Sequence, residues 1–369
     1  MNNQLRLFNE GARQALAAGE SVQFFLLDLL HHVDEKLQQL PPPPGTELDP
    51  SLNLQPHNEH VQHRVTIYDY VQTNLSMTEA RKQQIHGWIT KFSDLCIVSN
   101  IEAEIFLHGS IFQGTAITGS DCDISLRFAD SHHLEDVLHI LQANKHSMNL
   151  QNWIGIVGKA CPTIKCKTGS DISIDITDGR QRQQSLCTSY FIREILAKRP
   201  DAAIFIKIVK QFFMNAMFYG GAKQCLGGIA FSILILRGLQ YIGVLPAFGR
   251  FDFGEFGNLN AMCEQYWQAN EVQASTADDT KDETLYSRFI LILEWIIQTR
   301  LSEAISLGPN DNFQNPGVAA VVIFAPPNDY TNVASLVTAS NRDLWMLSGF
   351  KKLLAEWQAD PMKMLQRIA

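Results

Sequence analysis

The chain has 369 residues, of which 46% are hydrophobic, and it carries a formal net charge of -8 at pH 7. A chain of this size can bury one large core or two moderate ones, and we expect two domains. No apolar run reaches the length of a membrane span, and the residues after Met1 lack the order of a secretory signal, so we expect a soluble, intracellular protein with the cytoplasm favoured and no membrane partner. The seven cysteines include no Cys-x-x-Cys pair, which disfavours zinc and disulfides.

The first 78 residues are predicted to form a helical segment followed by a Pro-rich linker. Residues 4–39 show helical periodicity, with one apolar stripe from Val22 to Leu37. Pro41 to Pro44 end this pattern, and residues 45–63 are polar and contain further prolines, as linkers do. The next helix is predicted to begin at Thr78 and to run to about Asn100.

The strongest functional signal follows that helix. An apolar strand leads into Gly109-Ser110. After ten intervening residues, Asp121 and Asp123 lie on the next strand with one residue between them, so that they share a face. The glycine-serine turn offers backbone N–H groups and a hydroxyl to a phosphate, and two carboxylates are hard oxygen ligands for Mg²⁺. Because such close like charges repel, a divalent metal is the natural compensation. The pattern predicts a phosphoryl-transfer site with two Mg²⁺ or Mn²⁺ ions.

A third carboxylate is expected from a neighbouring strand. After a crossover helix predicted over 130–144, the runs 163–167 and 172–177 flank a turn signal and predict a β-hairpin. In the second strand the isoleucines face one way, and Asp175 faces the other way together with Asp171 at the strand's start. One of these two aspartates should complete the site.

The remaining chain is predicted to be helical. Residues 201–242 form two helices around a loop from Tyr219 to Leu226, and an amphipathic helix runs from Leu285 to about Ile305. The segment of about 270–283 is small, polar and acidic, which predicts a mobile loop.

These motifs resemble the DNA polymerase β-like nucleotidyltransferase superfamily, and within it the template-independent poly(A) polymerases and terminal uridylyltransferases. The resemblance is carried by Gly109-Ser110, Asp121-x-Asp123, a Pro-x-Ile-Lys strand at 162–165 and Ile-Asp-Ile at 174–176. It implies an α/β palm with a mixed sheet (residues 79–195), an α-helical second domain (196–369), and an active site in the cleft between them. It also implies a catalytic metal triad, Asp121, Asp123 and a third aspartate.

We assign the third ligand to Asp175, because it lies in mid-strand as the family's residue does. Asp171 is the alternative, since Asp171-Ile-Ser matches the Asp-Ile-Ser that uridylyltransferases often have at this strand.

A second resemblance, to the nuclear-type poly(A) polymerases, lies in the spacing of Lys210, Tyr219 and Gly227-Gly228-Ile229. It implies that Lys210 and Tyr219 bind the triphosphate together with the glycine-serine turn, and that Gly227, Gly228 and Ile229 border the base. Many family members carry a second basic residue where Met214 stands here, and Lys207, one turn before Lys210, is the candidate substitute.

The implied activity is the addition of nucleotides from NTP to the 3′ end of single-stranded RNA, with release of pyrophosphate. ATP is the favoured donor and UTP the other candidate. The negative net charge is unfavourable for binding the RNA backbone, so we expect a short or weakly bound RNA acceptor, or an RNA-binding protein partner.

Two alternatives remain open. Cyclic-dinucleotide and oligoadenylate synthases share the Gly-Ser and Asp-x-Asp pattern and often the Gly-Thr-Ala-Ile of residues 114–117. The other alternative is a catalytically inactive scaffold subunit, against which the intact carboxylates argue.

Overall fold

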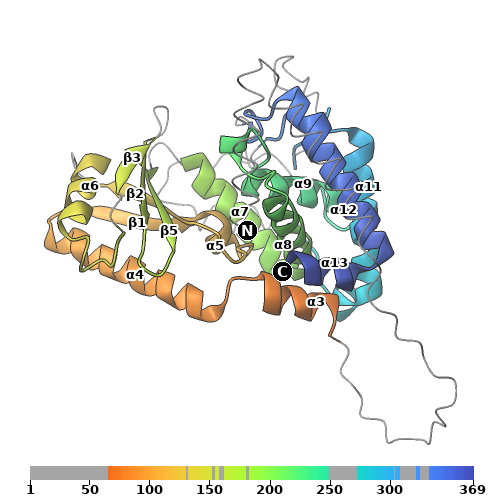
Figure 1. Ribbon diagram of the computed structural model, residues 1–369, viewed down its shortest axis with the longest axis horizontal. Coiled ribbons are helices and arrows are strands. Elements are labelled where there is room, and N and C mark those ends of the chain that lie inside the picture. The colour runs from red at the N-terminus through yellow and green to blue at the C-terminus, as the bar shows by residue number, and fades with distance from the viewer. Residues whose placement is uncertain are drawn as a thin grey trace, which may run out of the picture. The chain divides into compact units, whose positions relative to one another are not determined.

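A computed structural model describes residues 65–129, 132–151, 154–157, 162–179, 183–248, 272–302, 304–307, 321–324 and 332–369 (Figure 1). The helices and linker predicted over residues 4–63 lie outside the described residues. Among the helices of the described segments, none combines the length and the apolar character that crossing a membrane would require.

A five-stranded mixed sheet, in the order β1-β2-β5-β4-β3, forms the palm (Figure 1). Its strands are β1 (Ala103–His108), β2 (Cys122–Phe128), β3 (Gly155–Val157), β4 (Thr163–Lys167) and β5 (Ser173–Asp178). Neighbouring strands are antiparallel except β2 and β5, which run parallel with Asp123 opposite Asp175. The two aspartate-bearing strands are therefore adjacent, although many residues separate them in sequence.

The predicted hairpin is present as β4 and β5. Ile172, Ile174 and Ile176 are buried in the palm core, as their alternation predicts. The turn places Asp171 at a φ of 65°, a left-handed conformation that aspartate tolerates better than most residues. The turn and the strand alternation are local properties, which is why the sequence reveals them.

Two helices complete the palm core. Helix α4 (Glu79–Val98) begins where predicted, because the Thr78 side chain accepts a hydrogen bond from the Arg81 backbone N–H. Its buried residues Trp88 and Phe92 pack with the sheet residues in one hydrophobic cluster, beside which α4 runs in Figure 1. Helix α6 (Leu134–Ala143) corresponds to the predicted crossover helix.

A second, larger core is made almost entirely of helices. They are α7 (Gln183–Lys198), α8 (Pro200–Asn215), α9 (Gly228–Tyr241), α11 (Asp282–Thr299), α12 (Ser348–Ala359) and α13 (Pro361–Ile368), with the short α5 (Gly109–Gln113) between the palm and α7. The elements η3 (Gly221–Lys223) and η5 (Ala277–Thr280) are short 3₁₀ helices, and η6 (Asn341–Leu347) is a π-helix. Helices α8 and α9 flank the predicted loop, and α11 ends earlier than predicted.

The helical core also takes in two segments that the predicted domain limits leave outside it. Helix α3 (Ile67–Tyr70) and the turn η1 (Val71–Leu75) contribute Ile67, Val71 and Leu75 to this core. Helix α7 contributes Phe191 and Ile195 to this core and also contacts β1 and α5.

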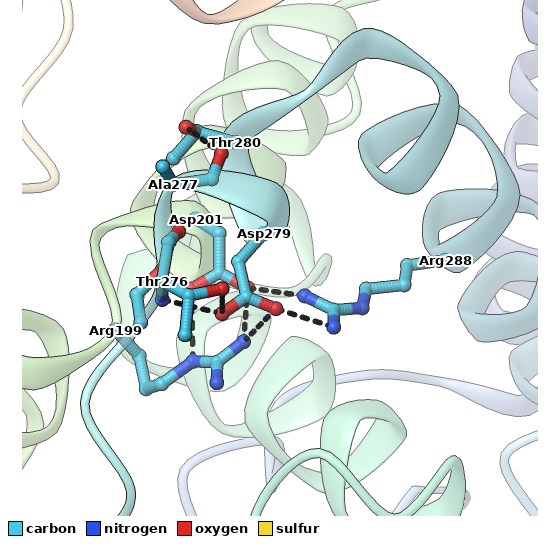
Figure 2. A network of polar contacts seen from close by, with 8 residues as sticks. Arg199, Asp201, Thr276, Ala277, Asp279, Thr280 and Arg288 are labelled. Atoms are coloured by element: carbon cyan, nitrogen blue, oxygen red, sulfur yellow. Dashed lines mark hydrogen bonds and ion pairs between the residues drawn. The ribbon is translucent and has the colours of Figure 1, made fainter.

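The acidic segment predicted to be mobile is folded where it is described. Asp279, 7% exposed, accepts hydrogen bonds from Thr276 in its own turn. It also pairs with Arg199 (3.5 Å) and Arg288 (2.5 Å), which both pair with the buried Asp201 (Figure 2). Composition alone misled the prediction, because the arginines that order η5 come from the start of α8 and from α11.

Candidate active site

Gly109 and Asp123 lie in such close contact that only glycine fits at position 109. Gly109 begins α5 at a φ of 67°, and a Cβ there would lie 2.0 Å from Asp123 Oδ2. Its backbone N–H donates to Ser189 Oγ at 3.1 Å, and Gln113 Nε2 donates to the same oxygen at 3.2 Å. Ser189, fully buried on α7, therefore anchors the glycine-serine turn over the carboxylate.

Three aspartates line one pocket of about 440 Å³: Asp121 and Asp123 from the start of β2, and Asp175 from β5. Burial raises the pKa of Asp123 to about 7, with the charges of Asp175 and Asp121 adding to the effect and Lys210 opposing it. Burial and the charge of Asp175 also raise the pKa of Asp121. The pocket thus holds carboxylates whose mutual repulsion calls for a positive charge.

The third carboxylate already has a cationic neighbour. Lys165, on the adjacent strand β4, forms an ion pair with Asp175. Within the described segments, no three His, Cys, Asp or Glu side chains are already arranged around one point that could hold a metal ion. The three aspartates nevertheless fit a hard divalent cation, because they offer carboxylate oxygens in one pocket, where their negative charges repel one another.

Asp171, the alternative third ligand, lies elsewhere. Its side chain is 75% exposed and pairs with Lys167 at 2.5 Å. The hydrogen bond from Lys167 lowers its pKa, and it lines a different hollow beside Arg81 and Ser173. Asp175, rather than Asp171, is the aspartate of β5 that the structure brings to Asp121 and Asp123.

Lys210, Tyr219 and Gly228 meet behind the carboxylates. A Cβ at Gly228 would lie 2.8 Å from Tyr219 Oη and 3.6 Å from Lys210 Cε, so this glycine leaves room for both side chains. Tyr219, Gly228 and Ile229 line the carboxylate pocket, whereas Gly227 is the N-terminal cap of α9 and is not among its lining residues.

Lys210 is buried next to this pocket. It is 1% exposed and donates to the carbonyl of Thr115 at 3.0 Å. Burial lowers its pKa to about 8, an effect that the negative charge of Asp123 opposes. Lys210 therefore lies close enough to the carboxylates to stabilise their charge.

Lys207 does not replace the missing second basic residue at this pocket. It donates to Ser76 Oγ at 2.8 Å and to Gln72 Oε1 at 3.2 Å, on the side of α8 that faces η1. Met214 occupies the pocket wall instead. Lys207 and Met214 lie on nearly the same side of α8, but they are seven residues apart, so Lys207 is displaced by about 10 Å along the helix axis.

No protein-family model and no curated protein matches the chain. Solved structures do match. The Cid1 poly(U) polymerase, bound to Mg and 3′-dATP, is 15% identical with a TM-score of 0.59, over 79% of this chain and 91% of that one. Terminal uridylyl transferase 4 from Trypanosoma brucei, bound to dUTP, is 12% identical with a TM-score of 0.59, over 79% and 96%. A variant of mtPAP, bound to ATPγS, is 12% identical with a TM-score of 0.60, over 83% and 71%.

The chain has the nucleotidyltransferase fold. The predicted fold class, a mixed-sheet palm with a helical second domain, is confirmed by this likeness and by the strand order.

Sequence reasoning missed several residues of the carboxylate pocket. Thr163 and Thr177 are partners across β4 and β5 and form a polar wall, and Ser185 on α7 contributes a further hydroxyl. Ser189 lies one turn after Ser185 on α7, so two serines four residues apart, on one face of the helix, were the available signal. His108, the last residue of β1, also lines the pocket.

Among the described residues, the basic side chains between the carboxylates and the helical domain do not form a continuous free surface for nucleic acid. Arg180 and Arg182 lie outside the described residues. Of the others, most are engaged within the protein: Lys165 and Lys167 with aspartates, Arg193 over the Phe112 ring, Arg199 in the buried network, Lys207 with Ser76 and Lys210 with Thr115. Lys198 is engaged as well.

Proposed function

We propose that the protein is a template-independent nucleotidyltransferase that adds nucleotides from NTP to the 3′ end of single-stranded RNA and releases pyrophosphate. The observation that carries this proposal is the convergence of Asp121, Asp123 and Asp175 beside the Gly109-Ser110 turn in one pocket of the nucleotidyltransferase fold. The rise of the Asp123 pKa to about 7 adds support, because unusual titration clusters at catalytic sites.

The three aspartates would hold Mg²⁺ or Mn²⁺, and two ions are proposed. When bound, these ions supply the positive charge that favours deprotonation of the RNA 3′-hydroxyl and stabilises the leaving pyrophosphate. Asp121 and Asp123 would serve both ions, and Asp175 the one at the 3′-hydroxyl. For Asp175 to ligate, Lys165 must turn aside, which solvent allows because the Lys165 side chain is 44% exposed.

The triphosphate would lie between the glycine-serine turn and α8. Gly109 is already bonded through its N–H to Ser189, so its role is to let phosphate and Asp123 approach closely, while Ser110 donates its hydroxyl. Tyr219 is positioned to donate its phenolic proton, since burial and the charge of Asp123 raise its pKa and keep it protonated. Lys210 would add its positive charge behind Tyr219.

The base would lie against Gly228 and Ile229, with Gly227 setting the start of α9 and Met214 opposite. This wall offers apolar surface and backbone rather than a charged discriminating group. We propose ATP as the preferred donor and UTP as the competing one. Most described basic residues near the pocket are engaged within the protein, which supports a short or weakly held RNA, or one presented by an RNA-binding protein partner.

The experiment that tests the proposal uses the two aspartates of the β4–β5 hairpin as a matched pair. Asp175→Ala and Asp171→Ala are purified beside the wild type and Asp121→Ala, and each is incubated with a labelled single-stranded RNA, one NTP at a time, and Mg²⁺ or Mn²⁺. Asp121→Ala and Asp175→Ala should lose at least about 100-fold in rate, whereas Asp171→Ala should stay near the wild type.

The products decide between the alternatives. Extension of the RNA by single nucleotides supports the proposal, and the NTP that is used most efficiently identifies the donor. If the wild type instead makes short 2′-linked or cyclic products from NTP without RNA, the enzyme belongs with the second-messenger synthases. If Asp121→Ala keeps wild-type activity, the proposed catalytic role of the carboxylates is refuted.

A further inference from the structure

A second cavity, of about 400 Å³, has no described lining residue in common with the carboxylate pocket. It is bordered by η1, by the start of α4, by Gly114 and Ala116 after α5, and by Lys207 from α8. Helices α5 and α8 contribute different residues to the two pockets, and the Thr115 carbonyl, between Gly114 and Ala116, accepts the hydrogen bond from Lys210. None of the residues assigned to catalysis lines this cavity.

The cavity contains a buried positive charge without a carboxylate partner. Lys207 is 5% exposed, and its hydrogen-bond partners among the described residues are the neutral oxygens of Ser76 and Gln72. Burial lowers its pKa to about 8, the charge of Lys82 lowers it further, and no acidic group of the described chain raises it. An ammonium group buried beside neutral partners is unfavourable unless an anion compensates it.

The other groups at the cavity also favour an anion. Lys82 lies at the rim of the cavity, and its side chain is 54% exposed. It forms an ion pair with Glu79 at 3.3 Å, which is weak because solvent screens it. Thr73 adds a hydroxyl, and the amide nitrogen of Gln72 has no hydrogen-bond partner in the part of the chain that is described. Two cations, one carboxylate and several neutral donors leave a net charge of +1 facing a space large enough for a phosphate group with its attached sugar.

We propose that this second cavity binds a phosphate group, with Lys207 as its buried anchor and Lys82 and Gln72 as further donors. The phosphate belongs either to the backbone of single-stranded RNA or to a free polyphosphate. The proposal does not depend on catalysis in the first pocket, because it concerns different residues.

Two binding measurements without divalent metal test it: calorimetric titration with inorganic pyrophosphate, and fluorescence anisotropy of a labelled single-stranded RNA. Lys207→Met should weaken the binding of at least one probe about tenfold or more, because it removes a charge-assisted hydrogen bond from a buried site. Lys82→Met, a substitution at an exposed rim, should weaken the same probe by about two- to fivefold. Lys352→Met removes an equally exposed charge from α12 and should change neither.

The two probes separate the sources of the phosphate. If RNA binding weakens, and the slope of the logarithm of the RNA binding constant against the logarithm of the salt concentration becomes shallower by about 1, the ligand is an RNA phosphate. If only pyrophosphate binding weakens, the ligand is a free polyphosphate. Lys210→Met, measured in the same titrations, shows whether a probe binds in the carboxylate pocket instead.

The proposal is overturned if both Lys207→Met and Lys82→Met bind both probes as the wild type does, or if Lys210→Met alone abolishes binding. Circular dichroism confirms that each variant is folded, and Lys82→Met keeps the test decisive should Lys207→Met not fold. Loss of polymerase activity in the aspartate variants would leave these results unchanged, so the two proposals can fail separately.

Discussion

Replacing Asp123 with asparagine should make the metal-free protein more stable. The folded protein holds the pKa of Asp123 at about 7, because of burial and the charges of Asp175 and Asp121, against an ordinary value of 3.8. A carboxyl whose pKa is raised by folding favours the folded state fully below the unfolded pKa and loses that contribution as pH rises towards the folded pKa. The metal-free protein therefore loses stability as the pH rises from about 4 to about 7, and the full loss remains at higher pH, where Asp123 is ionised.

The difference between 3.8 and about 7 corresponds to about 4 kcal/mol when Asp123 is fully ionised. About 2 to 3 kcal/mol of this develops between pH 5 and pH 8. Asp123→Asn keeps the size of the side chain and removes the charge, so its advantage over the wild type in free energy of unfolding should grow by that amount over this range. Added Mg²⁺ should stabilise the wild type and not the variant.

The assay is urea denaturation in EDTA at pH 5 and pH 8, with Asp201→Asn as the matched control. Asp201 is fully buried and pairs with Arg199 and Arg288, so the same substitution there should destabilise by about 3 to 5 kcal/mol. The reasoning is refuted if Asp123→Asn is less stable than the wild type at pH 8, or if its advantage is the same at both pH values.

Gly109→Ala should lose at least about tenfold in nucleotide incorporation and about 1 kcal/mol or more of stability, since the new Cβ meets Asp123 and φ is 67°; an active, stable variant contradicts the close approach. Lys165→Met should tighten Mn²⁺ binding, measured by electron paramagnetic resonance, because it frees Asp175 from its ion pair; unchanged affinity would mean that the pair does not compete with metal. Burial opposes ionisation of Asp279, but Thr276 and two arginines outweigh it and lower its pKa to about 2. Asp279→Asn should therefore destabilise at pH 7 and have a shrinking effect as pH falls from about 4 towards 2, which thermal unfolding at several pH values would show.

The local sequence determined much of this protein. The helix start at Thr78, the β4–β5 hairpin and the shared face of Asp121 and Asp123 follow from capping, turn chemistry and the two-residue period of a strand. The Gly109-Ser110 turn beside Asp-x-Asp predicted the pocket that the structure contains. Each of these features depends on residues that are close in the chain, so one sequence is enough to reveal them.

The tertiary structure decided what depends on distant residues. The parallel pairing of β2 with β5 places Asp175 opposite Asp123, whereas the turn leaves Asp171 exposed beside Lys167. The same holds for Ser189, which reaches Gly109 from α7, and for Asp279, which two distant arginines order. The burial and the electrostatic environment of a side chain depend on all the elements that the fold packs around it. A local sequence pattern does not show which distant elements those are.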